Sequence, residues 1–364
     1  MKKYCIVSFC NIYILPYAKT YIDAIVKNGA KCVLLFWDRD AVDGKNDNYP
    51  NCIKRCYSYA FNKESNRIDK LKGYLGAARL FQRELIKNDY DGIVFLQTHA
   101  AVACNSVIRR KYHKKYIVDI RDWTLENYAI YRRIEKICIK GSYSTVISSP
   151  AYSKFLPMGN YTIAHNYSPF DEDVIRSLRE KCSLGSNIKP LKISFVGTVR
   201  FFEMDKKIVD LFANDDRFQI NYYGTGSNLI KEYCEKNNIF NVDFYGAFPP
   251  QLTCDFYSKT DMINNLYGNH NKYLDYALSN KLYHSAQFYI PILVCPETYM
   301  EEITLKYNLG FVFDINSKYN KDQLFKWYQT ADVNEFKRGC DYFLQKVKED
   351  NAAFYNLIDK FSNG

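Results

Sequence analysis

The sequence predicts an α/β protein of two domains, each with a parallel sheet covered by helices on both faces. Three observations support this prediction. The chain has 364 residues, 47% of them hydrophobic, which is enough for two domains with real cores. Short apolar segments typical of buried strands alternate with longer segments of helical periodicity. This alternation pauses around residues 168–190 and then begins again, so the chain divides into two halves of similar organisation.

The first half opens with a buried strand at Tyr4–Phe9, followed by a helix at Tyr17–Asn28. Gly29 stands where a glycine ends a helix. The expected strands that follow are 31–38, 92–97, 116–120 and 144–149, and the expected helices lie within 65–92, 100–110 and 125–140.

The helix within 65–92 is amphipathic by its pattern. Its expected apolar stripe consists of Ile68, Leu71, Leu75, Ala78 and Leu85. The basic residues that surround this stripe are Lys70, Lys72, Arg79, Arg83 and Lys87.

The second half repeats the alternation. The expected strands are 191–197, 218–224, 242–246, 261–266 and 310–314, and the expected helices are 206–212, 229–237, 251–258 and others over 321–361. The segment 279–297 supplies a further helix and strand. Each half is therefore expected to be a Rossmann-like, doubly wound domain, and the carboxyl ends of both sheets are expected to face one interdomain cleft that binds ligands.

The positive charge of the chain is concentrated in the first half. Residues 1–170 contain 27 Lys and Arg against 14 Asp and Glu, whereas the remainder contains 23 against 26. The first half therefore has a net charge of +13 and the remainder a net charge of −3, which together give +10. The excess of positive charge in the first half predicts an anionic partner: a membrane surface, a nucleic acid or a phosphorylated substrate.

The twelve cysteines form no Cys-x-x-Cys pair, which predicts free thiols in a reducing compartment and no metal site built from them. The apolar start of the chain resembles a secretion signal, but Asn11 interrupts it and no small-residue cleavage site follows. No window reaches 18 apolar residues, so no membrane-spanning helix is expected.

Glycines follow two strands of the second half. Gly197 ends a strand and Arg200 follows it, an arrangement in which a substrate can approach the backbone while the guanidinium grips phosphate oxygens. Gly224 and Gly226 follow the next strand, as a Gly-x-Gly without a third glycine. Ordinary turns with a surface arginine are the alternative reading of both segments.

Polar residues end two strands of the first half. Asp119 and Arg121 alternate onto one face of a strand, and Asp122 follows at its lip. His99 ends the neighbouring strand. Asp122 or His99 can act as a base or orient a sugar hydroxyl, although a lone histidine is more often structural.

Two further motifs allow more than one interpretation. Asp38 and Asp40 can hold a divalent cation or a ribose, or they can be ordinary surface charge. The basic stretch Arg109–Lys115 suits a nucleic acid or an anionic lipid, or it is a solvated helix end.

The segments SFVGTVR, YYGTGS, DFYGAF and SNKLYHSAQFYIPILV occur in the second half in this order. Together they resemble the nucleotide-sugar domain of bacterial GT-B glycosyltransferases, above all the enzymes of capsule, exopolysaccharide and O-antigen assembly. In the first half, DIRDW and IAHNY (His165, Asn166 and Tyr167) are similar to segments of the same family.

The resemblance implies a domain division and a donor site. Residues 1–170 would bind the acceptor, residues 171–345 would bind the nucleotide sugar, and the helix 346–364 would cross back to the first domain. Ser279, Asn280 and Lys281 correspond to the helix start that holds the donor diphosphate, since free amides, the helix dipole and a lysine all favour phosphate. The base would lie near Gly246 and Phe248.

The chain departs from the family pattern at one point. Many retaining members have two glutamates eight residues apart, and the second binds the ribose. Here Tyr276 and His284 occupy these positions, and Glu297 is the carboxylate that can replace the missing one.

The function implied is transfer of a sugar from a nucleotide diphosphate sugar to a lipid-linked or oligosaccharide acceptor in bacterial surface polysaccharide synthesis. Arg200, Lys281 and helix amides would stabilise the leaving diphosphate without a metal or other cofactor. The catalytic candidates are Asp122, His99 and Arg121. The enzyme would be cytoplasmic and peripheral at the inner face of the cell membrane, held there by its basic first domain. A nucleic-acid-binding protein and a nucleotide-sugar epimerase remain as alternatives.

Overall fold

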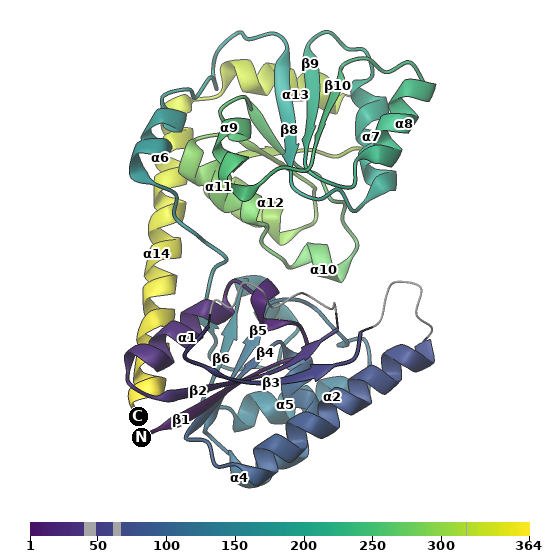
Figure 1. Ribbon diagram of the computed structural model, residues 1–364. Helices are drawn as coiled ribbons and strands as arrows, with labels where there is room; N and C mark the ends of the chain where they lie inside the picture. Colours follow the sequence, from purple (N-terminus) through teal and green to yellow (C-terminus); the bar gives the residue numbers. More distant parts are fainter. Residues whose placement is uncertain (40–48, 61–66, 318) are drawn as a thin grey trace. The chain divides into compact units, whose positions relative to one another are not determined.

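The computed structural model of the chain describes residues 1–39, 49–60, 67–317 and 319–364 (Figure 1). It contains two compact units, Met1–Asn166 with Glu349–Gly364, and Tyr167–Lys348. The sequence predicted the corresponding limits at residues 170 and 345.

The first unit contains a seven-stranded sheet in which every pair of neighbouring strands is parallel. Its spatial order is β3-β2-β1-β4-β5-β6-β7. The strands are β1 (Lys3–Ser8), β2 (Lys31–Asp38), β3 (Ile53–Ser58), β4 (Gly92–Leu96), β5 (Tyr116–Ile120), β6 (Ser144–Ile147) and β7 (Thr162–Ile163). The order reverses between β1 and β4, which is the doubly wound arrangement predicted from the sequence.

Helices cover both faces of this sheet. They are α1 (Ala18–Lys27), α2 (Arg67–Lys87), α3 (Thr98–Ala103), α4 (Asn105–Lys111), α5 (Ala129–Gly141) and the end of α14 (Val333–Asn363), with short 3-10 turns at Ile12–Ile14 and Pro150–Lys154. On one face, α1 and the end of α14 pack against alternate residues of β1 such as Tyr4 and Ile6. On the other face, Phe81 of α2 lies edge-on to Phe9, with ring centroids 5.0 Å apart.

Most of the apolar stripe expected on α2 does not lie on the face that the helix buries. Ile68, Leu71 and Leu75 are exposed and Ala78 is half-buried, whereas Leu85 is buried as expected, together with Gly73, Ala77 and Phe81. The reason is the shape of the sheet beneath it. A Cβ atom on Gly73 would lie 2.6 Å from Trp37, and one on Gly76 would lie 2.0 Å from Tyr57. The aromatic rings of Trp37 and Tyr57 fill the space under this part of α2, so the helix can approach there only with small residues.

The first half differs from the prediction in two other details. The single helix expected at 100–110 is two helices, α3 and α4, which meet at Cys104. The edge strand β3 was not predicted, because its residues Ile53–Ser58 are mostly exposed and lack the apolar run of a buried strand.

The end of α14 is fixed to the first unit by buried polar contacts. The backbone N–H of His165 donates to Oδ1 of Asn351 over 2.8 Å, and its Nε2 lies 3.2 Å from a carboxylate oxygen of Asp350. At the far end, the Tyr4 hydroxyl donates to the carbonyl of Phe361. The last turns of the chain therefore complete the core of the unit in which the chain begins.

The second unit contains a six-stranded sheet, again parallel throughout, in the order β10-β9-β8-β11-β12-β13. Its strands are β8 (Leu191–Val196), β9 (Phe218–Tyr223), β10 (Val242–Gly246), β11 (Met262–Asn265), β12 (Ile292–Val294) and β13 (Gly310–Val312). The order reverses between β8 and β11, so the place where ligands bind in such sheets lies beyond the ends of these two strands.

The helices of the second unit enclose a large core that contains residues of β8 to β12, with Phe311 and Val312 of β13 packed against it. They are α6 (Glu172–Arg179), α7 (Phe202–Phe212), α8 (Asn228–Lys236), α9 (Thr253–Tyr257), α10 (Lys272–Asp275), α11 (Asn280–Phe288), α12 (Tyr299–Lys306), α13 (Asn320–Thr330) and the first part of α14, with a 3-10 turn at Pro250–Leu252. Helix α6 lies within the expected linker. Asp171 caps it by accepting from the amides of Asp173 and Val174, a signal that the sequence did contain.

Candidate functional site

The glycine loops of the second unit lie side by side at the carboxyl edge of its sheet. The amide of Gly197 donates to the carbonyl of Tyr223, and the amide of Gly224 donates to the carbonyl of Gly246, both over 2.8 Å. A Cβ atom on Gly224 would lie 1.9 Å from the Gly197 carbonyl oxygen, and one on Gly226 would lie 2.5 Å from that of Val199. Only glycine allows the loops after β8 and β9 to approach this closely.

Lys281 lies next to these loops, at the reversal point of the sheet. Its Nζ donates to the hydroxyl of Tyr267, which follows β11, over 2.6 Å. The same Nζ lies 4.2 Å from the ring centroid of Phe195 on β8, and 3.7 Å from where a Cβ of Gly197 would be. The lysine therefore bridges the two strands between which the strand order reverses.

The electrostatics around Lys281 favour an anion. Burial lowers the pKa of Lys281 to about 7, while the Asp205 carboxylate raises it and the Arg200 guanidinium lowers it. Arg200 is exposed, and it forms no ion pair with any residue that the structure describes. An anion that contacted both cations would hold the lysine in its charged form and would relieve their mutual repulsion.

Asp205 is a buried acid near Lys281. It lies on α7, is 4% exposed and accepts a hydrogen bond from the Tyr222 hydroxyl over 3.0 Å. Burial raises the pKa of Asp205 to about 6, against the hydrogen bond from Tyr222 and the charge of Lys281, which both lower it.

The start of α11 has the predicted geometry. Ser279 is the N-cap, and its hydroxyl accepts from the amide of Lys281 over 3.3 Å. Asn280 is the first helical residue and is exposed. The helix begins next to the reversal point of the sheet. Residues 279–281 therefore supply both the cap and the lysine side chain that reaches this point.

His284 lies one turn further along α11. Its Nδ1 is 2.9 Å from the Tyr257 hydroxyl, and its ring contacts those of Phe170 and Tyr257, at centroid distances of 5.4 and 5.3 Å. Burial, and then the charge of Lys281, lower the pKa of His284 to about 4. The side chain at this position is therefore a neutral imidazole held by a tyrosine, with Nε2 as its other hydrogen-bonding atom.

Aromatic side chains surround the position predicted for the base. Phe248 lies edge-on to Phe256, Phe256 stacks on Tyr223 and Tyr223 stacks on Tyr245, with centroid distances of 4.6, 4.3 and 4.5 Å. Gly246, the last residue of β10, has a φ of 69° and open space beside its Cα. Tyr245 is 53% exposed, so one end of this aromatic row is open to a flat ligand.

Glu297 follows β12 and lies on the surface. Its carboxylate is 3.8 Å from Nδ1 of His270, and both side chains are largely exposed. Within the described residues it has no hydrogen bond or ion pair to the glycine loops or to Lys281.

In the first unit, Arg121 is a buried connector. Its Nε and Nη2 donate to the two oxygens of Asp119 over 2.6 and 2.8 Å, and its Nη1 donates to the carbonyl of Ala164 and to Oδ1 of Asn166. The expected pairing of Asp119 with Arg121 on one face of β5 is confirmed. The guanidinium joins β5 to the segment after β7, which is a structural task.

His99 and Asp122 lie at the carboxyl edge of the first sheet, after β4 and β5. The Nε2 of His99 is buried without a hydrogen-bond partner in the described part of the chain, and its ring lies 5.2 Å from that of Phe9. Burial, and then the charge of Arg39, lower the pKa of His99 to about 4, so it is a weak base. Asp122 is exposed and therefore accessible to a substrate.

The possible cation motif at the end of β2 is only partly described. Asp38 accepts a hydrogen bond from the Asn11 side chain over 2.9 Å, whereas Asp40 lies outside the described residues. Across 1–39, 49–60, 67–317 and 319–364, no three His, Cys, Asp or Glu residues gather as metal ligands would. No helix in these same ranges is both long and apolar enough to cross a membrane.

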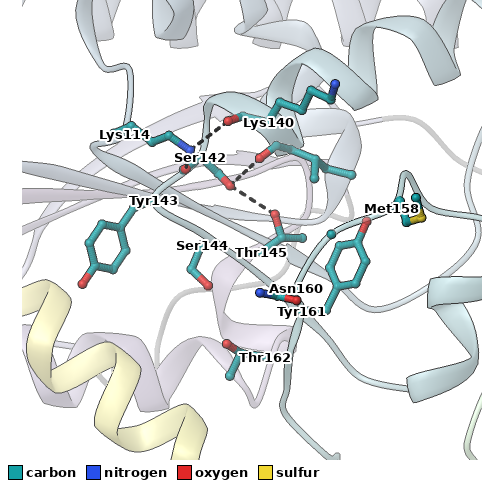
Figure 2. A pocket seen from close by; sticks show the side chains of 12 residues that line it. Lys114, Lys140, Ser142, Tyr143, Ser144, Thr145, Met158, Asn160, Tyr161 and Thr162 are labelled. Carbon is teal, nitrogen blue, oxygen red and sulfur yellow. Dashed lines mark hydrogen bonds between the residues drawn. The ribbon is translucent and has the colours of Figure 1, made fainter.

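A pocket of about 380 Å³ in the first unit belongs to the other edge of the sheet (Figure 2). It is lined by Ser144 and Thr162, which begin β6 and β7, and by Lys114. The amine of Lys114 donates to the carbonyls of Lys140 and Ser142, both over 2.9 Å (Figure 2). Because His99 and Asp122 follow the carboxyl ends of their strands, this pocket is separate from them.

Two residues of the candidate site were not predicted from the sequence. Tyr267 stands directly before a glycine just beyond β11, and its position at the strand end was the available signal. Asp205 shares the buried face of α7 with Ile208, Val209 and Phe212. A single carboxylate on an otherwise apolar helix face was the signal that could have found it.

Comparisons with known proteins identify the fold. No protein-family model matches the chain, and no curated protein sequence matches it. Several solved structures, however, are similar to the chain over nearly its whole length. Sucrose-phosphate synthase from Thermosynechococcus elongatus has a TM-score of 0.68 and 11% identity, covering 99% of this chain and 96% of its own. The lipopolysaccharide outer core galactosyltransferase WaaB has a TM-score of 0.60 and 13% identity, with 99% and 97% covered. HepE of Anabaena, in complex with UDP-glucose, has a TM-score of 0.63 and 11% identity, with 98% and 99% covered.

These similarities extend over both units and agree with the two doubly wound sheets. The class of protein is therefore a two-domain α/β architecture with one doubly wound parallel sheet in each domain. More specifically, the chain has the GT-B fold of glycosyltransferases.

Proposed function

We propose that the protein is a glycosyltransferase that uses a nucleotide diphosphate sugar as its donor, bound on the second unit. The observation that carries this proposal is the convergence of Lys281, Tyr267 and Gly197 at the reversal point of the second sheet, with Arg200 beside them. A bound diphosphate would give these two cations a shared anionic partner. HepE, a structural neighbour, binds UDP and UDP-glucose, which supports the same class of donor here.

The reaction is displacement of the nucleoside diphosphate at the anomeric carbon by an acceptor hydroxyl. As the bond to the diphosphate breaks, negative charge accumulates on its oxygens. Arg200, Lys281 and the first amides of α11 would neutralise this charge without a divalent cation. The position of Lys281 suits this task because Tyr267 and Ser279 both restrict its movement.

The nucleoside would extend from the diphosphate along α11 towards β10. The base would lie near Gly246 and Phe248, where Tyr223, Tyr245 and Phe256 offer aromatic surface. His284 would contact the ribose through its Nε2, since Nδ1 is occupied by Tyr257. Glu297 remains a candidate for a further carboxylate contact.

The acceptor would bind the first unit, as a lipid-diphosphate-linked sugar or an oligosaccharide in bacterial surface polysaccharide assembly, such as capsule or O-antigen. The structural neighbour WaaB is a lipopolysaccharide outer core galactosyltransferase, which supports an acceptor of this kind. Asp122 would take the acceptor proton, because it is exposed whereas the ring of His99 is enclosed. A lipid-linked acceptor implies work at the cytoplasmic face of a membrane.

Saturation-transfer NMR with a panel of nucleotide diphosphate sugars tests the donor site. We expect at least one member to bind, and binding to be lost in the double variant Arg200→Ala/Lys281→Ala. Lys236→Ala, an exposed lysine on α8, is the matched control and should bind as the wild type does. Absence of binding by every donor, or binding that survives the double substitution, would reject the proposed site.

Two activity measurements test the role of Asp122 and the independence of the reaction from a divalent cation. Once a donor is known, Asp122→Asn should lower turnover strongly while leaving donor binding unchanged. Turnover should also be insensitive to excess EDTA. Strong inhibition by EDTA would instead favour a cation at the end of β2.

A further inference from the structure

The outer face of α2 carries a row of exposed apolar side chains. Ile68, Leu71, Leu75 and Ile86 are 65%, 58%, 46% and 61% exposed. Successive spacings of three, four and eleven residues place all four on one side of a helix, since eleven residues are close to three turns. Single exposed apolar residues need no explanation, but four aligned on one helix face do.

Basic residues border this row. Lys72, Arg79 and Arg83 are exposed and follow one flank of it along the helix. Helix α4 packs beside α2, and α5 packs beside α4, as Figure 1 shows. The three helices together contain 13 Lys and Arg but only three Asp and Glu, so this layer carries most of the positive charge of the first unit.

The apolar row is held on the outside by the way α2 is anchored. Its opposite face meets Trp37 and Tyr57 through Gly73 and Gly76, where a larger residue would clash. At its end, the Lys111 amine donates to the carbonyl of Ile86 over 3.0 Å. The helix therefore cannot turn its apolar row inward without losing the contacts that fix it to the sheet.

We propose that the outer face of α2, flanked by α4 and α5, is a docking surface for a bilayer of anionic lipid. The helix would lie in the plane of the interface, with Ile68, Leu71, Leu75 and Ile86 entering the boundary between head groups and acyl chains. Lys72, Arg79 and Arg83 would meet the lipid phosphates. Such a surface would bring the enzyme to a lipid-linked acceptor, and in that respect it rests on the proposed function.

The apolar row favours lipid over the other partners that a basic layer can attract. A nucleic acid would use the charges, but it would leave the isoleucine and leucine side chains in water. A second copy of the chain docked through the same face would bring Arg79 and Arg83 close to their own equivalents, which like-charge repulsion opposes. A bilayer surface satisfies both the apolar row and its positive border.

Vesicle sedimentation tests the proposal on the full chain. The probe vesicles are phosphatidylcholine with or without phosphatidylglycerol. We expect binding to the vesicles that contain phosphatidylglycerol, and weaker binding as salt rises from about 0.05 M to about 0.5 M. Leu71→Gln/Leu75→Gln should weaken vesicle binding at least about ten-fold by removing buried apolar area. Arg79→Glu/Arg83→Glu should do the same by reversing the charge.

The matched control is Leu229→Gln/Leu305→Gln, which alters two leucines of α8 and α12 with exposures of 59% and 64%. It should bind vesicles as the wild type does. The proposal is overturned if the wild type does not bind phosphatidylglycerol vesicles at low salt, or if Leu71→Gln/Leu75→Gln binds normally. It is also overturned if the control loses vesicle binding to the same extent. A fourth contrary result is that Leu71→Gln/Leu75→Gln abolishes a dimer of the chain but leaves vesicle binding unchanged.

Donor binding separates this proposal from the proposed function. The α2 variants lie in the first unit, so each should retain nucleotide-sugar binding in the NMR experiment. Vesicle binding without any donor binding would leave the docking surface standing and remove the transferase proposal. Donor binding without vesicle binding would leave the transferase proposal standing and remove the docking surface.

Discussion

The amine of Lys281 donates to the hydroxyl of Tyr267 over 2.6 Å, and this contact joins the start of α11 to the end of β11 at the point where the sheet order reverses. The lysine side chain is 6% exposed. A buried ammonium group needs partners for its three N–H bonds, and the neutral tyrosine is the hydrogen-bond acceptor that the structure provides. The contact therefore keeps a cation available for an anionic ligand.

Tyr267→Phe should weaken donor binding, because it removes this acceptor while keeping the ring. We expect a loss of about 1–2 kcal/mol in binding free energy, measured by titration calorimetry with the best donor. Tyr342→Phe, an exposed tyrosine on α14, is the control and should change nothing. Unchanged affinity in Tyr267→Phe would mean that Lys281 is positioned without the tyrosine.

Donor binding should take up a proton. The pKa of Lys281 is lowered to about 7 in the free protein, mainly by burial, and a bound diphosphate would raise it. At pH 8 the free amine is mostly neutral, so binding should take up close to one proton, whereas at pH 6 it should take up almost none. The dissociation constant should rise above pH 7, by up to about ten-fold per pH unit.

Calorimetry in two buffers of different ionisation enthalpy measures this uptake directly. Lys236→Ala should keep the uptake, and Lys281→Met should lose it together with most of the affinity. Proton uptake at pH 8 that persists in Lys281→Met would assign the titration to another group.

Lys281→Met should stabilise the protein in a pH-dependent way. Between pH 7 and the ordinary lysine pKa of 10.5, the unfolded chain binds a proton that the folded wild type does not, so wild-type stability rises with pH in this window. Methionine has no such titration. The variant should be more stable by on the order of 2–4 kcal/mol below pH 7, and this advantage should shrink as the pH rises towards 10.5.

Urea unfolding from pH 6 to pH 9.5 measures the difference between the two proteins. A difference in the free energy of unfolding that stays constant over this range would contradict a titrating lysine at position 281.

Gly224→Ala and Gly246→Ala separate steric clash from backbone strain. Both glycines have positive φ, of 132° and 69°, but a Cβ on Gly224 would overlap the Gly197 carbonyl whereas one on Gly246 meets open space. Gly246→Ala should lower the free energy of unfolding by only about 1 kcal/mol. Gly224→Ala should cost clearly more, at least about 3 kcal/mol, and should disrupt the donor site. Equal losses of stability in the two variants, measured by thermal unfolding, would show that the loops after β8 and β9 can move apart to accommodate the new side chain.

Asn351→Ala should loosen the end of α14. It removes the acceptor of a buried backbone N–H, that of His165, at a cost of about 1–3 kcal/mol. Hydrogen exchange should become faster over residues 349–364, with little change in the sheet of the second unit. Asn316→Ala, in a loop of the second unit, should leave exchange in α14 as it is.

The sequence alone determined most of the alternation of strands and helices, apart from β3, α6 and the break between α3 and α4, and it pointed to the glycines that end the strands of the second unit. Gly197, Gly224 and Gly246 were recognisable because each ends an apolar segment, and parallel strands must then bring the three together at one edge. Ser279 was recognisable as a cap because capping is a local interaction. Local propensity and periodicity depend on residues that are close in the sequence, so they can be recognised from one sequence.

The tertiary structure alone decided which surfaces meet. The large residues of α2 formed the obvious stripe, yet the helix buries Gly73 and Ala77, because Trp37 and Tyr57 already occupy the space above the sheet. In the same way, nothing near Lys281 in the sequence indicates Asp205 or Tyr267 as its neighbours. Which face packs inward and which charges meet depend on the volume and chemistry contributed by distant segments, and that information exists only when those segments are folded together.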